Sequence, residues 1–405
     1  MRIKRWWLIG LVGLLVLSSG LVSMAAEPVV KEWEIPSIVY LSGPWAAFGL
    51  ETKWAMDTAV EDVNAAGGIR GIPLKLTWYD DGFDTAKAVQ QTSRALSQKP
   101  LMLLGPQADI PQAAGLPLCA KEGVFSLTGI GVCSYPVQND HWGTCLFDEM
   151  RRTNQPSAKY WAEKHKGEIT SVIIFMNLVS SVIEEQADGI KEVLAANGVK
   201  VLPYLEVPPD TVNFKSIALK AINSGANGFI CITGPDQAAK LTIALRQNGV
   251  KEGFRIWNYY GCDAPPLYEI AKGFLEDTYV NGVYDPNFKG ERWQALVKRY
   301  QEYKEDPNTV PTFAVPVSYN LPWIVKQTFE ACQITGDPAK LKEEREKIRD
   351  YILNLKDFDG IQGKITVIRD MGGALHPTFM FQIKDNKPVM VAMMEPLPYE
   401  GPSKK

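Results

Sequence analysis

The sequence predicts an α/β fold in which parallel strands alternate with helices that cover both faces of each sheet. Short apolar runs recur along the chain, and most are bounded by Gly, Pro, Asn or Asp. The helical segments between them end at glycine, as at Asn197-Gly198, Ser224-Gly225 and Asn248-Gly249. This alternation is typical of sheets with helices on both faces. About 380 residues, once a leader is removed, are enough for two cores of ordinary size.

The apolar runs give the expected order of strands. They cover residues 38–41, 74–79, 101–104, 124–128, 171–175, 199–204, 228–232, 255–258, 279–283, 378–383 and 389–392. Residues 286–355 are mostly helical by the same criterion, most clearly at 293–300 and 318–332.

Residues 38–96 are the most informative stretch. An apolar strand runs into the loop Ser42-Gly43-Pro44, and a helix follows whose apolar positions share one face: Ala55, Met56, Ala59, Val60 and Val63. Gly67-Gly68 ends that helix. A second strand leads to Asp84, a predicted N-cap for the next helix. Strand-to-helix loops of this kind form small-molecule sites in open α/β sheets.

The first residues read as an export leader. Arg2, Lys4 and Arg5 precede an apolar run over 6–17, and small residues follow at Ser23 and Ala25. We therefore expect cleavage after Ala25 or Ala26. An uncleaved anchor is the alternative, although the apolar run is short for a membrane span. No cysteine lies near the cut, so no lipid anchor is expected.

Composition excludes several classes of protein. Loss of the three leader cations lowers the formal net charge from −3 to −6, and no basic run is present, so no nucleic-acid partner is expected. The chain has six Cys without a CxxC and only three His, so neither a metal nor another cofactor is expected. Cys133 and Cys145 flank a turn-rich loop and are the first candidates for a disulfide; buried free thiols are the alternative.

The amino-acid sequence of residues 38–96 resembles that of the type I periplasmic solute-binding proteins, in particular the branched-chain amino-acid (Leu/Ile/Val) receptors of ABC transporters. Ser42-Gly43-Pro44, Asn64-Ala65-Ala66-Gly67-Gly68-Ile69 and Tyr79-Asp80-Asp81 carry the likeness. Weaker likeness continues at 158–232 and 358–365.

The resemblance implies two Rossmann-like lobes with parallel sheets, joined by a hinge of three crossings near 150, 284 and 366 in a Venus-flytrap arrangement. The implied division is 1–25 as leader, 27–150 plus 285–365 as first lobe, and 151–284 plus 366–398 as second lobe.

In such a fold the ligand would lie between the carboxyl ends of the two sheets. The first-lobe candidates are Trp45, Phe48, Gln107, Ala108, Asp109, Thr128, Gly129 and Ile130. Trp45 and Phe48 either contact the ligand or pack under their loop. Amino-acid binders of the family usually carry Ser or Thr near Asp109 to hold the α-carboxylate, whereas Asp109 would repel one. Asp109 is also suited to be the N-cap of the following helix. Of the family's third loop only Thr128 matches.

The second-lobe candidates are Asn177, Pro235, Asp236, Tyr259, Tyr260 and Asp263. Tyr259-Tyr260 stands where the amino-acid binders place an acid for the ammonium group. A buried unpaired ammonium is costly. Either Asp263 or Asp109 therefore pairs with it, or the ligand has none.

These features predict a periplasmic receptor that captures a small solute by lobe closure and delivers it to the membrane permease of an ABC importer. The ligand would be a branched-chain or related amino acid, or an apolar or aromatic carboxylate or amide, since aromatic walls favour flat apolar groups. A monomer without catalytic residues is expected. An exported sensor with the same fold is the alternative. An enzyme is a distant third, since the chain lacks G-x-S-x-G, P-loop and H-E-x-x-H motifs.

Overall fold

The computed structural model describes residues 27–43, 45–177, 181–208, 210–250 and 253–401. The predicted leader and its cleavage sites lie outside these residues. Within them, no helix combines the length and apolar character needed to cross a bilayer.

The first sheet has five parallel strands in the order β2-β1-β3-β4-β5. They are β1 (Trp33–Val39), β2 (Leu74–Asp80), β3 (Met102–Leu104), β4 (Phe125–Thr128) and β5 (Gly143–Cys145). Every residue of β3, β4 and β5 is buried. Parallel strands read as continuous apolar runs because both of their faces are covered.

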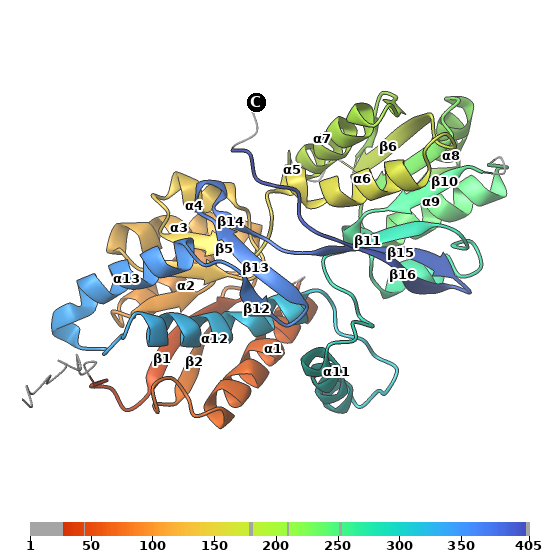
Figure 1. The fold of residues 1–405 in the computed structure, drawn as a ribbon. Helices are drawn as coiled ribbons and strands as arrows, with labels where there is room; N and C mark the ends of the chain where they lie inside the picture. Colours follow the sequence, from red (N-terminus) through yellow and green to blue (C-terminus); the bar gives the residue numbers. More distant parts are fainter. Residues whose placement is uncertain (1–26, 44, 178–180, 209, 251–252, 402–405) are drawn as a thin grey trace, which may run out of the picture.

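Helices from both ends of the sequence cover this sheet (Figure 1). They are α1 (Ala46–Ala65), α2 (Thr85–Leu96), α3 (Asp109–Glu122), α12 (Ala314–Ala331) and α13 (Leu341–Leu353). Helix α11 (Glu291–Lys304) packs on α1 and α12 and lies away from the sheet (Figure 1). One core joins the strands to α1, α12 and α13, and includes Met56, Phe329 and Ile348. A second core, on α2 and α3, includes Leu116 and Cys119. We call this sheet and its helices the first lobe.

Local signals explain where these helices begin and end. Asp84 is the N-cap of α2 as predicted, because its Oδ1 accepts a hydrogen bond from the Lys87 N–H at 2.8 Å. Helix α3 ends at Gly123, whose φ of 60° is the left-handed conformation that glycine adopts without strain.

The second sheet has the order β16-β15-β11-β10-β9-β6-β7, and β8 pairs with β6 beside β7. Its strands are β6 (Ser171–Asn177), β7 (Lys200–Val201), β8 (Leu205–Val207), β9 (Gly228–Ile232), β10 (Arg255–Asn258), β11 (Tyr279–Gly282), β15 (Thr378–Lys384) and β16 (Lys387–Met394). All are parallel except the pairs made by β15. The single strand predicted over 199–204 is wrong, because Pro203 interrupts the run and two short strands form instead.

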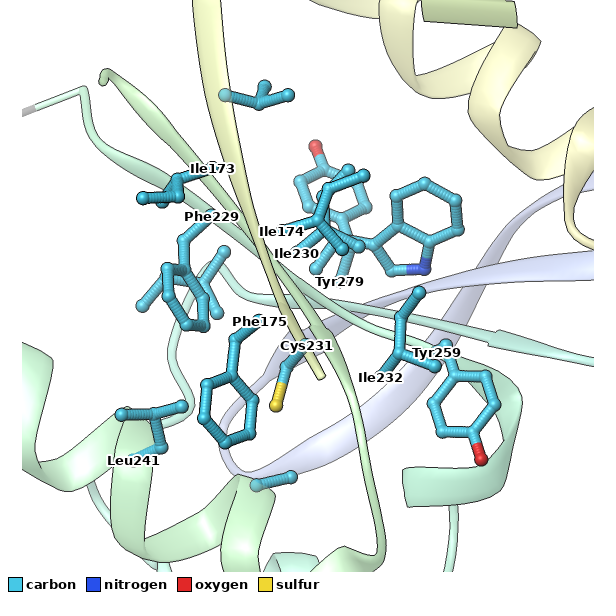
Figure 2. Packing of buried hydrophobic residues seen from close by; sticks show 14 of the residues in the cluster. Ile173, Ile174, Phe175, Phe229, Ile230, Cys231, Ile232, Leu241, Tyr259 and Tyr279 are labelled. Carbon is cyan, nitrogen blue, oxygen red and sulfur yellow. The ribbon is translucent and has the colours of Figure 1, made fainter. Parts of the chain in front are cut away.

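This sheet carries the larger core. Its helices are α6 (Gln155–Lys164), α7 (Ser181–Ala196), α8 (Phe214–Asn223), α9 (Pro235–Gln247) and α10 (Pro265–Ile270). Figure 2 shows Phe175 beside Phe229, whose rings stack with centres 6.4 Å apart. Tyr259 lies beside Ile232 at the end of the same cluster. We call this unit the second lobe.

Three connections join the lobes (Figure 1). The first leaves β5 and passes through α5 (Met150–Thr153) into α6; the second leaves β11 and reaches α11. A small antiparallel sheet precedes the third connection in the sequence. It consists of β12 (Phe358–Gly360), β13 (Gly363–Ile368) and β14 (Gly373–Leu375). β14 contacts β5, whereas β15 pairs with β11. Strand pairing thus places the third connection between 375 and 378, later than the predicted crossing near 366.

Candidate functional site

The carboxyl ends of both parallel sheets face the connections between the lobes. β5 and β11 each continue from their carboxyl ends into the other lobe. Since the parallel strands of each sheet share one direction, the loops after β1, β3 and β4 lie on the same side as the loops after β6, β9 and β10. We call these opposed surfaces the inter-lobe face.

The loop after β1 is fixed by Asp80 at the end of β2. Its Oδ1 accepts hydrogen bonds from the N–H groups of Leu41, Ser42 and Gly82 at 2.8, 3.1 and 2.9 Å. These bonds hold the pKa of Asp80 below its usual value although burial opposes them. The loop therefore presents Trp45, 50% exposed, against Phe48 and Phe83 at ring-centre distances of 6.1 and 5.9 Å.

Two glutamine side chains accept hydrogen bonds from backbone N–H groups of the loop after β4. The buried Gln107 accepts from the N–H groups of Gly129 and Ile130 through its Oε1, at 2.9 and 3.3 Å. The buried Gln112 accepts from the Val132 N–H at 2.7 Å. These three backbone N–H groups are therefore already paired within the protein. Gln107 Nε2 is left buried without a hydrogen-bond partner.

The other predicted first-lobe residues have structural surroundings. Thr128 is buried, and its hydroxyl donates to the Thr144 carbonyl oxygen at 3.3 Å. Ala108 is buried with a φ of 69°, and its N–H donates to the Ile130 carbonyl oxygen at 2.9 Å. The predicted N-cap role of Asp109 is wrong, because Ala108 is the N-cap and Asp109 is the first residue of α3. The N-cap of α3 thus lies at Ala108, which has a positive φ, one residue before the predicted N-cap.

In the second lobe, Asn177 at the end of β6 is tied to the loop after β9. Its Nδ2 donates to Gln237 Oε1 at 2.9 Å, and Gln237 also accepts from the Thr233 hydroxyl at 2.7 Å. Pro235 and Asp236 begin α9, and Asp236 forms an exposed ion pair with Lys240 at 2.6 Å. Helix α9 has no side-chain hydrogen bond at its N-cap.

The loop after β10 brings two tyrosines and an acid together. It contains the short 3-10 helix η1 (Tyr260–Cys262), and the rings of Tyr259 and Tyr260 lie 5.0 Å apart. Tyr259 is buried at the edge of the second-lobe core, whereas Tyr260 is partly exposed. Asp263 accepts a hydrogen bond from the Tyr268 hydroxyl at 2.6 Å, and burial raises the pKa of Asp263 to about 6.

Six aromatic rings form a continuous row between the lobes, which we call the aromatic row. Successive ring centres lie 6.1, 5.8, 6.2, 6.5 and 5.0 Å apart along Trp45, Phe48, Phe313, Phe147, Tyr260 and Tyr259. The sequence predicted both ends of this row but missed Phe313 and Phe147. Phe147 lies in the first connection and Phe313 precedes α12. Nothing in their local sequence distinguishes them from packing residues.

In the part of the chain that the structure describes, no group of three or more His, Cys, Asp or Glu side chains could hold a metal ion. The arrangement offers aromatic surface from both lobes and, from α3 and α9, two helix N-termini without side-chain caps. Such a site can bind a flat apolar group and orient one or two polar atoms.

Comparisons with known proteins agree with this architecture. The family model described as "Periplasmic binding protein" matches residues 32–388. The Leu/Ile/Val-binding protein homolog 3 of Brucella melitensis is 25% identical over 209 residues, which is 50% of this chain and 54% of that protein. The chain thus matches about half the length of that relative.

Solved structures share the fold at low identity. LivJ of Streptococcus pneumoniae in complex with isoleucine has a TM-score of 0.71 and 18% identity, covering 90% of this chain and 99% of that one. A solute-binding protein of an ABC transporter from Rhodopseudomonas palustris, in complex with 3,4-dihydroxybenzoic acid, has a TM-score of 0.73 and 12% identity, covering 91% and 99%. The family match spans nearly the whole described chain, so the protein belongs to the periplasmic binding protein family, whose members are binding proteins rather than enzymes.

Proposed function

We propose that the protein is the extracytoplasmic receptor of an ABC importer and that its ligand is a flat apolar or aromatic acid or amide. The aromatic row carries this proposal. Rings from both lobes lie in sequence across the inter-lobe face, and aromatic faces favour offset or edge contacts with a planar ligand.

The polar groups support an aromatic acid or amide over an amino acid. The three N–H groups of the loop after β4 are already bonded to Gln107 and Gln112. Asp109 adds a negative charge to the first turn of α3, which offsets the positive end of that helix. In the second lobe the charge of Asp236 is balanced by Lys240, so the N-terminus of α9 keeps more of its partial positive charge. We infer that the ligand's oxygen atoms bind α9 while its ring lies on the aromatic row.

A branched-chain or related amino acid is the second candidate, and Asp263 favours it. Asp263 lies three residues after Tyr260, and its carboxylate accepts a hydrogen bond from the hydroxyl of Tyr268. An ammonium group beside Asp263 would supply the positive charge that this buried acid lacks.

A thermal-shift screen of protein refolded without ligand tests both candidates. The panel is benzoate, benzamide, 4-methylpentanoate, leucine and isoleucine. Ligand at about a thousandfold over its dissociation constant stabilises the folded protein by about 4 kcal/mol. Shifts with benzoate or benzamide alone support the aromatic ligand, whereas shifts with leucine and isoleucine alone support the amino acid and contradict our first choice.

Variants then test the place of binding. Tyr260→Ala should weaken the affinity for the ligand found in the screen by about tenfold, roughly 1.4 kcal/mol. Tyr303→Ala is the matched control, since Tyr303 is an exposed aromatic residue stacked on Trp54 and outside the aromatic row. Equal affinities in the two variants would place the ligand elsewhere.

The partner is tested in cells. Deleting the gene should abolish uptake of the labelled ligand if the protein serves an importer. Unchanged uptake together with a lost transcriptional response to the ligand would instead indicate an exported sensor.

A further inference from the structure

The thiols of Cys133 and Cys145 meet in a closed space beside the first connection between the lobes. Their Sγ atoms lie 3.2 Å apart, and both residues are buried. Cys133 precedes α4 (Ser134–Gln138), and Cys145 ends β5. The chain therefore brings together two sulfur atoms that are twelve residues apart in sequence, without a long loop between them.

The surroundings of the two sulfur atoms are built for a compact pair. Both thiols face the carbonyl oxygen of Phe147, at 3.2 Å from Cys133 and 3.7 Å from Cys145. Gly373 covers them: a Cβ on that residue would lie 2.3 Å from Cys133 Sγ and 2.4 Å from the Phe147 oxygen. No larger residue fits at 373 without moving the sulfur atoms.

We propose that Cys133 and Cys145 form a disulfide in the exported protein. Two S–H bonds break and one S–S bond forms, releasing two protons and two electrons. A protein disulfide outside the cytoplasm accepts the two electrons and two protons by thiol–disulfide exchange and leaves as a dithiol. Membership of the periplasmic binding protein family places the chain where such oxidants persist.

The burial of the two thiols in the folded protein determines at which stage the disulfide can form. The attacking species is a thiolate. The neighbouring Cys145 thiol and burial both raise the pKa of Cys133, which disfavours its thiolate, and the burial of both residues keeps a protein oxidant away from the folded pair. Oxidation therefore takes place while the chain folds, before Gly373 and β14 close over the pair.

The other four cysteines differ from this pair. Cys119 is buried in the α2–α3 core, and Cys332 is partly exposed with its thiol directed at the Lys347 carbonyl oxygen at 3.6 Å. The Cys262 thiol donates to the carbonyl oxygens of Thr233 and Cys231 at 3.1 and 3.7 Å. Cys231 and Cys262 are also neighbours, since burial and the Cys262 thiol both raise the pKa of Cys231. Each thiol of the Cys133–Cys145 pair instead lies against the other sulfur and the Phe147 oxygen.

Peptide mapping tests the proposal directly. The protein is secreted into the periplasm, purified without reductant, unfolded in an alkylating reagent at mildly acidic pH and digested. Trypsin leaves Cys133 and Cys145 together in the peptide 122–151, which contains no other cysteine. We expect this peptide unalkylated and lighter by two hydrogen atoms than its reduced form, and chymotryptic cleavage after Trp142 should give two fragments that separate only after reduction.

Thermal unfolding supplies a second readout. Reduction should lower the Tm of the wild type by about 5 to 10 °C, as expected for a loop of this length. The Cys133→Ala/Cys145→Ala variant should melt near the reduced wild type and respond no further to reductant. Cys332→Ser, the control, should keep the full response.

Two results would overturn the proposal: alkylation of both cysteines in the unreduced wild type, or a link from either one to another cysteine. Neither readout depends on a ligand, so this outcome is separate from the fate of the proposed function.

Discussion

The two lobes use similar strand-to-helix loops in opposite ways at the inter-lobe face. In the first lobe, Gln107 and Gln112 bond the backbone donors of the loop after β4, and Asp109 offsets the positive end of α3. In the second lobe, Tyr260 is partly exposed and the N-terminus of α9 has no side-chain cap, so both remain available to a ligand. The difference indicates a division of roles. We infer from it that, under the proposed function, the first lobe presents a mostly apolar wall and the second lobe supplies the polar contacts to the ligand.

Removing the glutamine that stabilises the first-lobe wall should have the largest effect. Gln107→Ala leaves the N–H groups of the buried Gly129 and the partly buried Ile130 without their acceptor, and a buried unpaired donor costs about 1–3 kcal/mol. We expect a loss of about 3 kcal/mol in the free energy of unfolding, measured by urea denaturation.

The second-lobe counterpart sharpens this comparison. Gln237→Ala removes an acceptor shared by Asn177 and Thr233. Gln237 is only partly buried, so water can replace its oxygen atom. We expect a loss of about 1 kcal/mol. Equal losses in the two variants would contradict the view that only the first-lobe loop depends on a buried carboxamide.

The buried acid of the first lobe should make stability depend on pH. Asp81 is fully buried, its Oδ1 accepts from the Phe83 N–H at 2.9 Å, and its Oδ2 has no partner. Burial raises the pKa of Asp81 from 3.8 to about 7. The folded state therefore binds the proton more tightly, and this group's contribution to stability falls as pH rises from about 4 to about 7.

Asp81→Asn should remove that dependence. It keeps the acceptor for Phe83 and removes the buried charge, so we expect a gain of about 1–3 kcal/mol at pH 8 and almost none near pH 4. Urea unfolding at both pH values measures it. Asp84→Asn at the exposed N-cap of α2 is the control. A gain of equal size at both pH values would show that the charge of Asp81 is not its cause.

Aromatic truncation in each lobe compares their shares of ligand affinity. Trp45→Ala removes an exposed end of the aromatic row, and we expect a loss of about fivefold, compared with about tenfold for Tyr260→Ala. Titration calorimetry with the ligand from the screen measures both. A larger loss at Trp45 would reverse the assigned roles of the lobes.

The smallest effect is expected from charge at the helix N-termini. Asp236→Asn removes an acid from the N-terminus of α9, where we place the ligand's oxygen atoms, and should raise the affinity for a carboxylate by two- to fivefold at low salt, consistent with about 0.3–1 kcal/mol for such a charge. Asp109→Asn, at the N-terminus of α3, should change the affinity less. A larger gain in Asp109→Asn would place the carboxylate at α3 and contradict the proposed orientation of the ligand.

The sequence was most informative where structure is local. The strands at 228–232 and 255–258 were predicted with their observed bounds, because continuous apolar runs between turn residues leave few alternatives. The Asp84 cap was predicted for the same reason, since its hydrogen bond spans three residues. The family and fold followed from the wording of one strand–helix–strand unit.

The inter-lobe face was less accessible to prediction, because its contacts join distant residues. Gln107 was a candidate ligand contact, but its bonds to Gly129 and Ile130 depend on how the loops after β3 and β4 meet. Phe313 reaches Phe48 and Phe147 across more than 160 residues of sequence. The N-cap prediction at Asp109 failed because the backbone of Ala108 adopts a positive φ that its sequence does not favour.

The three connections also determine the order in which the protein can fold. The first-lobe core that contains Trp33 and Met56 is completed by Leu321, Val325 and Phe329 of α12. At ordinary synthesis rates those residues follow the end of β5 by roughly ten to forty seconds. During that interval the apolar face of the first sheet that α12 covers in the folded protein is still exposed. The connectivity thus leaves the first-lobe core incomplete until α12 has been synthesised.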